Sequence, residues 1–329
     1  MKEQLLKAPQ ENFSRGLFEV DIPELGPKIQ GKVRDMWIVD NKRVIVTTDR
    51  QSAFDKIICT IPGKGAVLNG LSGWWFSANK DSIPTHYIFC PHPNVMITKE
   101  AKIKIPVEVV FRRYMAKSST RTSVYYNYAE LGRRTIYGVD FPDGLGANCE
   151  FPQGTILTPT TKAETGHDEE LTDEQAQELV DKVAGIGTWQ KIKEIGFRFF
   201  EHAYYYHQRA GLILVDTKFE FGLDSQGNLM LIDEVFTPDS SRLWLLETYN
   251  QRFQAQQNPE TFDKEILRRW LAENSFTGDG QVQVVPSEVI EKMSQAYKLP
   301  YQMITGQNIL DEQTDTGEIR QAIFEYLST

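Results

Sequence analysis

The clearest pattern of apolar and polar positions lies between residues 211 and 244. Residues 212–215 and 229–232 are short apolar runs, and residues 224–228, Asp-Ser-Gln-Gly-Asn, have the composition of a turn. Apolar runs on either side of such a turn predict a β-hairpin. The hairpin is therefore the first element that the chain predicts.

Charged residues continue the first apolar run of this hairpin. Because successive side chains of a strand point to opposite faces, Asp216, Lys218 and Glu220 are expected on one face. Thr217, Phe219 and Phe221 are then expected on the other face. The sequence thus predicts a strand with one apolar and one charged side.

The register of the hairpin decides which acid faces Lys218. A hairpin symmetric about Gln226 places Lys218 opposite Glu234, and a slip of one residue places it opposite Asp233. Acids that follow buried strands often hold an ammonium group or a divalent cation, and Mg²⁺ prefers such oxygen ligands. A solvated strand face of alternating charge is the alternative interpretation.

Residues 27–50 predict a strand, a turn at residues 40–42, and a second strand. Gly31 and Lys32 open this segment. A glycine followed by a lysine at a strand edge lets the backbone approach a phosphate while the ammonium supplies charge. Taken alone, such a pair is most often an ordinary turn with a solvated lysine. The sequence contains no P-loop and no GxGxxG after a strand.

Helical patterns and loops fill most of the remaining chain. A helix is expected at about 68–78, with Trp74, Trp75 and Phe76 in the core, and residues 138–171 are expected to be loops. A cap-like pattern at Thr172 starts the next helical region. The later expected helical stretches are 172–209, with interruptions at Gly185, Gly187 and Gly196, and then 259–274, 286–298 and 316–327.

Residues 105–121 combine an apolar strand with a basic segment that contains no acid. The segment carries Arg112, Arg113, Lys117 and Arg121, with Ser118 and Ser119 among them. Basic groups interleaved with hydroxyls suit a phosphate or a carboxylate. A solvated basic loop is the alternative.

Composition limits the possible classes of protein. The 329 residues predict two domains with an appendage, and the formal net charge of −9 argues against general nucleic-acid binding. Cys59, Cys90 and Cys149 are too scattered for a disulfide framework or a thiolate metal site. No signal-peptide core and no membrane-length apolar run is present, so we expect a cytoplasmic protein without membrane partners.

Taken together, these stretches resemble the SAICAR synthetase (phosphoribosylaminoimidazole-succinocarboxamide synthase) family of purine biosynthesis in its longer, single-function form. The stretches that carry the resemblance are GKVRDMWIVD (31–40), TTDRQSAFDK (47–56), IPVEVVFRR (105–113), TPTTKAETGHDEE (158–170), LVDTKFEFG (214–222) and DEVFTPDSSRLW (233–244). The run DTKFEFG together with PDSSRLW is the most specific of these signals.

The resemblance implies a fold and a reaction. The implied fold is α+β, with two domains around an ATP cleft, distantly similar to protein kinases, and a C-terminal helical extension. We expect divisions at 1–110, 111–250 and 251–329. The implied reaction joins the carboxylate of carboxyaminoimidazole ribotide (CAIR) to the amine of L-aspartate, with ATP and Mg²⁺, to give SAICAR, ADP and phosphate. Phosphoryl transfer from ATP would activate the carboxylate as an acyl phosphate, so no protein nucleophile is needed.

The resemblance also implies roles for individual residues. Asp216 and Lys218 would be catalytic, and Glu220 and Glu234 would be linked to Mg²⁺, with Asp233 as a rival because of the register. The residues implied for ATP are Gly31, Lys32, Arg34 and Glu108, and those implied for the ribotide are Arg112, Ser118 and Arg242. Lys162, His167 and Asp168 fall on the family's mobile loop near the substrates.

One position departs from the family. Lys117 stands where a glycine usually precedes the serine matched by Ser118. The side chain of Lys117 adds a phosphate contact or displaces Ser118, and both alternatives remain open at this point.

Two other functions fit parts of the pattern. One is an ATP-dependent phosphotransferase on the same kinase-like frame, and the other is a nucleotide-sensing module. A sensor has no need of the charged face at 216–220 together with a separate basic site, which argues against it. The expected partners are small-molecule substrates, and the protein is expected to be a monomer or a small homo-oligomer.

Overall fold

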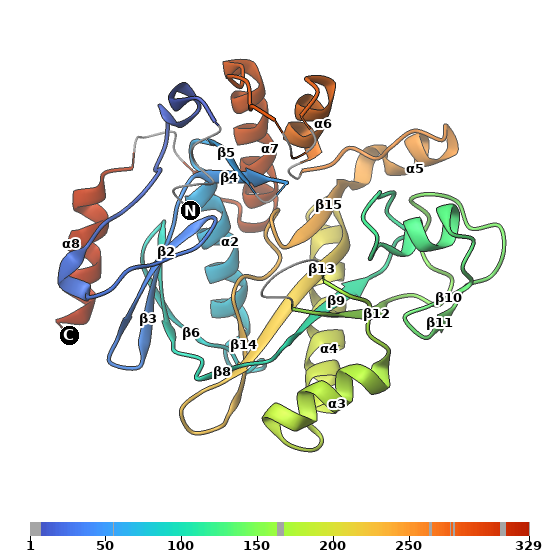
Figure 1. Ribbon diagram of the computed structural model, residues 1–329, viewed down its shortest axis with the longest axis horizontal. Helices are drawn as coiled ribbons and strands as arrows, with labels where there is room; N and C mark the ends of the chain where they lie inside the picture. The colour runs from blue at the N-terminus through green and yellow to red at the C-terminus, as the bar shows by residue number, and fades with distance from the viewer. Residues whose placement is uncertain are drawn as a thin grey trace.

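The computed structural model describes residues 8–54, 56–162, 168–262, 265–276, 278, 280–309 and 314–328. The chain combines helices and strands in an α+β arrangement, built around two antiparallel sheets that meet near the middle of the molecule (Figure 1).

The first sheet has five strands in the order β1-β2-β3-β7-β6. Their bounds are β1 Ile29–Gln30, β2 Arg34–Val39, β3 Lys42–Thr47, β7 Val95–Lys99 and β6 Tyr87–His92. Asp40 and Asn41 join β2 to β3 with φ of 47° and 63°, a left-handed conformation that these residue types tolerate in tight hairpins. The predicted turn is thus confirmed.

This sheet is covered on both faces. Ile45 and Met96 face α2 (Lys64–Asn79), while Val44 and Val46 belong to a second core cluster that includes Ile319 and Ile323 of α8 (Thr316–Leu327). The last helix of the chain therefore lies beside the first strands, as seen at the edge of the molecule in Figure 1.

The second sheet contains the hairpin predicted from the sequence. Its main path is β12-β9-β13-β14, and β15 and β8 also pair with β13. The bounds are β12 Ile156–Thr161, β9 Val107–Arg112, β13 Leu212–Leu223, β14 Leu229–Ile232, β15 Ser241–Leu245 and β8 Ile103–Lys104. Leu223 pairs with Leu229 and Glu220 with Ile232, so the hairpin is symmetric about Gln226.

Strand β12 contradicts the expectation of loops throughout residues 138–171. It pairs with β9 along its whole length and forms an edge of the sheet. Pro159 and the polar residues around it argued against a strand in the sequence. Proline has no N–H to donate, but it is tolerated here because β12 lies at a sheet edge. A short hairpin of β10 (Thr135–Ile136) and β11 (Val139–Asp140) precedes it.

Helices α3 (Asp173–Ala184) and α4 (Thr188–Arg209) match the predicted helical region. Thr172 and Gln175 form the expected capping box, and Gly185 and Gly187 break the helix with φ of 90° and 85°. Gly196 does not interrupt α4. A Cβ there would meet the ring of Phe111 at 2.3 Å, so this glycine instead allows α4 to pack closely on β9.

The C-terminal helices follow the sequence pattern with shifted bounds. They are α6 (Glu265–Glu273), α7 (Ser287–Thr305) and α8, and α5 (Leu246–Gln254) precedes them although the pattern did not predict it. Helix α2 begins at Lys64, four residues before the expected start, and α7 packs against it. Trp75 and Phe76 are fully buried, in agreement with the expected core.

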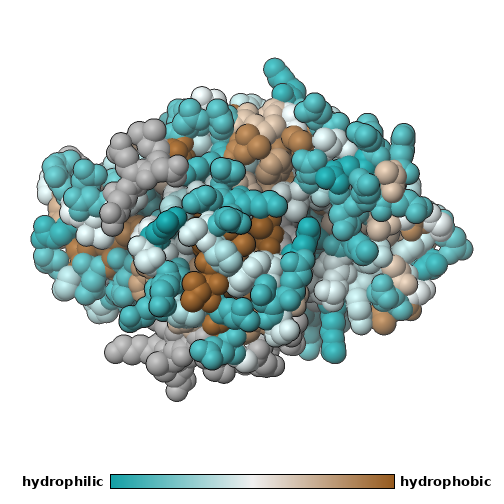
Figure 2. Space-filling model, turned by 90° about the horizontal axis from the view of Figure 1, so that it is seen from above, coloured by the Kyte–Doolittle hydropathy of each residue, from teal (hydrophilic) through white to brown (hydrophobic). Residues whose placement is uncertain are grey.

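The remaining elements are short. They are the 3-10 turns Gln10–Phe13 and Pro23–Leu25, strands β4 (Arg50–Ala53) and β5 (Lys56–Thr60), and the π-helical turn Tyr126–Glu130. The face on the side of α6 and α7 is mostly hydrophilic, with apolar residues in separate patches (Figure 2). Among the described residues, no helix has both the length and the apolar character needed to cross a membrane.

Candidate active site

Strand β13 separates charged from apolar side chains as its sequence predicts. Thr217, Phe219 and Phe221 are completely buried on one face. Lys218 and Glu220 lie on the other face, where their side chains form an ion pair of 2.6 Å. This alternation gives the site a rigid support, because β13 is paired on both sides.

The first group of charges, here called the Lys218 cluster, surrounds one ammonium with acids. Besides Glu220, the Lys218 Nζ lies 3.2 Å from Glu108 Oε1 and 3.8 Å from Asp233 Oδ2. A second ammonium, that of Lys162, also donates to Glu220. Lys218, Glu108, Glu220, Asp233 and Lys162 therefore come together from four separate stretches of the chain.

The carboxylates around Lys218 favour its protonated, positively charged form. Burial alone would lower the pKa of Lys218, but the carboxylates of Asp233, Glu220 and Glu108 outweigh burial and raise that pKa well above its usual value. Burial raises the pKa of Glu108, and the Lys218 ammonium opposes that effect. The exposed Asp168 contributes to the same rise.

The end of the hairpin differs from the simple symmetric expectation. The register is the one that would set Lys218 against Glu234, but the pairing of β13 with β14 ends at Ile232. Asp233 takes a left-handed φ of 67°, and the N–H of Lys218 donates to the carbonyl of Ser240 instead. Lys218 thus approaches Asp233, although no register slip has occurred.

Arg34 binds both acids at this point. Its Nη1 lies 2.8 Å from Asp233 Oδ1, and its Nη2 lies 2.9 Å from Glu234 Oε2. Glu234 also accepts a hydrogen bond of 2.7 Å from Thr237. Burial would raise the pKa of Asp233, but Arg34 and Lys218 hold it far below its usual value.

These contacts bring the Gly31–Arg34 turn to the hairpin. The Gly31 N–H donates to the Arg34 carbonyl at 2.7 Å, which closes the turn, and Lys32 is exposed beside it. The residues that the resemblance implies for ATP therefore adjoin the acids that it implies for the metal.

The second group, here called the Asp216 cluster, has the opposite arrangement. The Asp216 carboxylate lies between Arg112, at 2.8 Å, and Arg242, whose Nε lies 2.9 Å from Oδ2. Both arginines are supplied by neighbouring strands, since Asp216 pairs with Arg112 of β9 and Arg242 of β15. Burial would raise the pKa of Asp216, but the two arginines lower it overall.

The basic segment after β9 does not act as one patch. Arg112 joins the Asp216 cluster, whereas Arg113 pairs with Glu150 at 2.8 Å and lies over the ring of Tyr204. Lys117 is exposed, and the Ser118 hydroxyl accepts the N–H of Thr120 at 3.2 Å. Of the expected substrate residues, His167 lies outside the described residues.

The carboxylates of the site could supply some, but not all, of the ligands of a magnesium ion. Within the described ranges, no three His, Cys, Asp or Glu side chains gather as a complete metal site. Glu220 and Asp233 nevertheless both face the Lys218 ammonium. One or two carboxylates are enough for Mg²⁺ when nucleotide phosphates and water supply the other ligands.

Sequence patterns missed several buried polar residues near these clusters. Lys64 and Asp239 form an ion pair of 2.7 Å, in which the lysine is fully buried, and the Tyr297 hydroxyl lies 2.7 Å from the same carboxylate. Arg50 is also fully buried, against Asp35. Their charge was visible in the sequence, but the partners lie too far apart along the chain for any spacing to reveal them.

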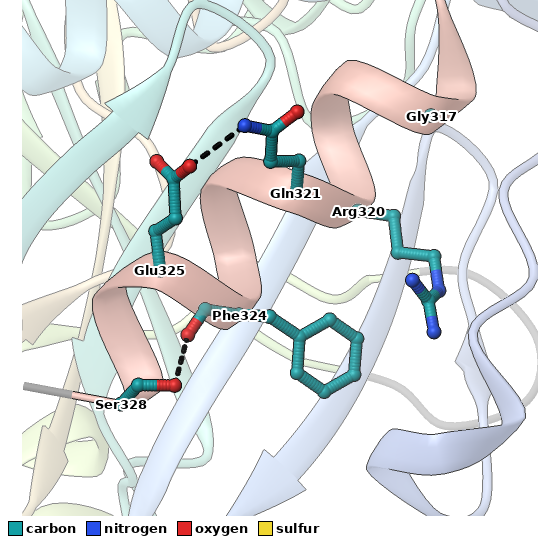
Figure 3. Close-up of a pocket in the computed structure, with 6 residues that line it drawn as sticks. All are labelled: Gly317, Arg320, Gln321, Phe324, Glu325 and Ser328. Carbon is teal, nitrogen blue, oxygen red and sulfur yellow. Dashed lines mark hydrogen bonds between the residues drawn. The ribbon is translucent and has the colours of Figure 1, made fainter.

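A surface hollow lies elsewhere, on helix α8. It is lined by Gly317, Arg320, Gln321, Phe324, Glu325 and Ser328. Gln321 donates a hydrogen bond to Glu325 along the helix (Figure 3). None of its lining residues belongs to the two clusters, so the hollow adds nothing to the site.

Comparisons with known proteins identify relatives of this chain. A sequence model described as SAICAR synthetase matches residues 28–285. The phosphoribosylaminoimidazole-succinocarboxamide synthase of Legionella pneumophila (strain Lens) is 41% identical over 295 residues, covering 89% of this chain and 92% of the relative.

Solved structures are similar as well. SAICAR synthase from Saccharomyces cerevisiae complexed with SAICAR has a TM-score of 0.74 and 30% identity, covering 89% of this chain and 99% of that one. A SAICAR synthetase in complex with ADP has a TM-score of 0.63 and 25% identity, covering 86% of this chain and 100% of the other. On the extent of the family match and the identity to its members, the chain belongs to the SAICAR synthetase family.

Proposed function

We propose that the protein is an ATP-dependent ligase that joins the carboxylate of CAIR to the amine of L-aspartate, giving SAICAR, ADP and phosphate in purine biosynthesis. One observation carries the proposal: the acid-rich Lys218 cluster and the arginine-rich Asp216 cluster adjoin on one strand. A reaction between two anionic substrates and ATP needs such neutralisation at two separate points. The yeast relative complexed with SAICAR and the relative in complex with ADP support the choice of ligands.

The Gly31–Arg34 turn is the proposed nucleotide-binding element. Backbone N–H groups of the turn and the exposed Lys32 would bind phosphate oxygens. Arg34 would hold the turn against Asp233 and Glu234, to which it is bonded. Glu108, beside Lys218, would complete the ATP side of the site.

Glu220 and Asp233 are the proposed magnesium acids, because both face the position of the Lys218 ammonium. Arg34 binds both Asp233 and Glu234, but the second partner of Glu234 is the Thr237 hydroxyl and not Lys218, which favours a supporting role for Glu234. When bound, Mg²⁺ would neutralise phosphate charge during transfer.

Arg112, Arg242 and Ser118 are the proposed contacts of the ribotide. The two arginines bring one positive charge in excess of Asp216, which suits a phosphate or carboxylate. Lys162 and His167 are proposed to contact the substrates as well. Lys162 already bonds to Glu220.

The chemistry proposed for Lys218 is electrostatic. The CAIR carboxylate would attack the γ-phosphorus, forming an acyl phosphate and releasing ADP. The amine of aspartate would then displace phosphate, with cleavage of the acyl C–O bond and loss of a proton from nitrogen. Lys218 would stabilise the negative charge that passes from the nucleotide to the acyl oxygen, and Asp216 would fix the arginines beside it.

We further propose a kinase-like division around an ATP cleft, with sequence regions 1–110, 111–250 and 251–329. Strand β9 crosses the first of these boundaries. A cytoplasmic location and a monomer or small homo-oligomer belong to the same proposal.

The test is ADP release in the presence of ATP, Mg²⁺ and CAIR, with and without L-aspartate. The ligase requires aspartate for steady turnover and yields SAICAR by mass spectrometry. Steady ADP release without aspartate, together with a phosphorylated CAIR product, would identify a phosphotransferase instead.

The acyl phosphate has its own test. With ¹⁸O in the CAIR carboxylate, one labelled oxygen is expected in the released phosphate, because the C–O bond breaks on amide formation. Unlabelled phosphate would exclude this intermediate while leaving the ligase assignment intact.

A further inference from the structure

We propose that Arg50 and Thr48 are positioning residues for the nucleotide-binding turn: they hold the carbonyl oxygens of Gly31, Lys32 and Val33 from the interior and thereby aim the N–H groups of the turn at the nucleotide phosphates. The inference rests on the proposed function of the turn. Residues 47–50, which take no part in the proposed catalytic chemistry, would then support the turn.

The contacts of Arg50 are directed at the turn itself. Its Nη2 donates to the Gly31 carbonyl at 3.1 Å, and its Nε donates to the Lys32 carbonyl at 3.0 Å. The residue is completely buried. Two successive peptide groups are thus held by one rigid side chain.

The rest of the guanidinium is anchored just as firmly. Asp35, also fully buried, accepts from Nη2 at 2.8 Å and from Nη1 at 3.3 Å, and the Phe18 carbonyl accepts from Nη1 at 2.7 Å. Asp35 in turn accepts the N–H of Val20 at 2.9 Å. Arginine has five N–H donors in a planar fork, and here each has an acceptor, which a lysine could not reproduce.

Thr48 extends the same support by one peptide. Its backbone N–H and its hydroxyl both donate to the Val33 carbonyl, at 2.9 and 2.7 Å. Three consecutive carbonyls, those of Gly31, Lys32 and Val33, are therefore held by residues two positions apart in one segment.

Because the peptide bond is planar, fixing a carbonyl oxygen also fixes the direction of the next N–H group. In a planar trans peptide the C=O and the N–H point in opposite directions. When the Gly31 carbonyl points inward to Arg50, the N–H of Lys32 points outward, and the Lys32 carbonyl fixes the N–H of Val33 in the same way. Successive N–H groups fixed on one side of a turn are what bind phosphate oxygens.

The five-stranded sheet that carries the turn offers a matched control. Arg43 of β3 makes a two-point ion pair with Glu100, at 2.7 and 2.8 Å, and is also largely buried. Its Nη1 contacts the sulfur of Met36, so Arg43 resembles Arg50 in chemistry but bonds to no carbonyl of the turn. Loss of stability is common to both arginines, whereas loss of nucleotide binding is expected for Arg50 alone.

The experiment compares Arg50→Lys with Arg43→Lys in the full chain. We measure ADP affinity by calorimetry, KM for CAIR and for ATP, and amide hydrogen exchange of the peptide that contains residues 29–35. For Arg50→Lys we expect ADP affinity to fall by roughly tenfold to thirtyfold and exchange in that peptide to rise, because several charge-assisted bonds are lost. KM for CAIR should change by less than about twofold. Arg43→Lys should leave ADP affinity and exchange at the turn unchanged.

Thr48→Val keeps the inference testable if Arg50→Lys does not fold. Valine has the same shape as threonine but lacks the hydroxyl, so ADP affinity should fall by roughly threefold to tenfold. Wild-type ADP affinity in either folded variant, or equal losses for ADP and CAIR, would overturn the inference. A wild-type protein that does not bind ADP would overturn the proposed function itself, which is a distinct result.

Discussion

The two charged clusters on β13 have opposite compositions although their central residues are only two positions apart. In the Lys218 cluster, three carboxylates face two ammonium groups. In the Asp216 cluster, one carboxylate faces two arginines. Residues two positions apart on a strand lie roughly 7 Å from each other. One strand face thus presents an acid-rich position next to a base-rich one.

We infer from this difference that the two clusters bind different ligands. An excess of carboxylate suits a cation and its bound nucleotide, and an excess of guanidinium suits an anionic substrate. The central side chains also differ in exposure: Lys218 is 30% exposed, and Asp216 only 8%. We therefore expect Lys218 to meet the reacting groups and Asp216 to act through its arginines.

The largest effect is expected when the Lys218 cluster loses its ammonium. Lys218→Met should lower kcat about a hundredfold to a thousandfold with modest changes in KM, because the charge acts mainly in the transition state. Steady-state ADP release measures this. Lys193→Met, which removes the partner of Asp173 far from the site, is the control and should keep kcat. A large rise in KM at constant kcat would leave Lys218 with a role in binding only.

The next effect separates the clusters by substrate. Arg112→Ala and Arg242→Ala should raise KM for CAIR about tenfold to a hundredfold while leaving KM for ATP nearly unchanged, because each removes a charge-assisted contact. Arg113→Ala is a matched control, since the neighbouring arginine pairs with Glu150 instead. Equal rises for ATP and CAIR would erase the proposed division between the clusters.

A smaller effect should distinguish the two adjacent acids. Asp233→Asn is expected to weaken use of Mg·ATP roughly tenfold, with partial recovery in excess Mg²⁺, because a metal ligand is lost. Glu234→Gln should cost less, since Asp233 lies beside the Lys218 ammonium whereas Glu234 accepts from the Thr237 hydroxyl. If Glu234→Gln has the larger and Mg²⁺-dependent defect, the metal acids need to be reassigned.

The smallest effect concerns stability in acid. The pKa of Asp216 is lowered by its arginines, so its ion pairs contribute stability above the unfolded-state value of about 3.9 and lose it as pH falls through the lower folded value. Urea unfolding of wild type and Asp216→Asn should therefore differ most near neutral pH, begin to converge as pH falls below about 3.9, and agree once the pH lies below the folded value. A difference that grows on acidification would reverse the sign assigned to this carboxylate.

Local patterns predicted much of the framework of this site. Alternation along β13, the turn at 224–228 and the cap at Thr172 each depend on neighbouring residues, so their sequence determines them. The charged face at 216–220 was evident for the same reason. The later helices were also recognisable, although α7 continues seven residues past its expected end at 298.

The missed features depend on contacts between distant residues. Gly196 looks like a helix breaker until Phe111 is placed against it, and β12 looks like a loop until β9 is beside it. The approach of Asp233 to Lys218 depends on a left-handed residue at the end of a strand. Alternation alone cannot anticipate where pairing stops.

The position of α8 has a consequence for synthesis of the chain. Ile319 and Ile323 fill the core behind the first sheet, and Arg320 pairs with Glu24, 296 residues earlier. A chain emerging from the ribosome cannot make these contacts until α8 has emerged, and contacts between such distant residues slow folding. The strands of the sheet that carries the nucleotide-binding turn are therefore synthesised well before the helix that covers them, so nascent chains should gain full protection of this sheet from proteases only once α8 has emerged.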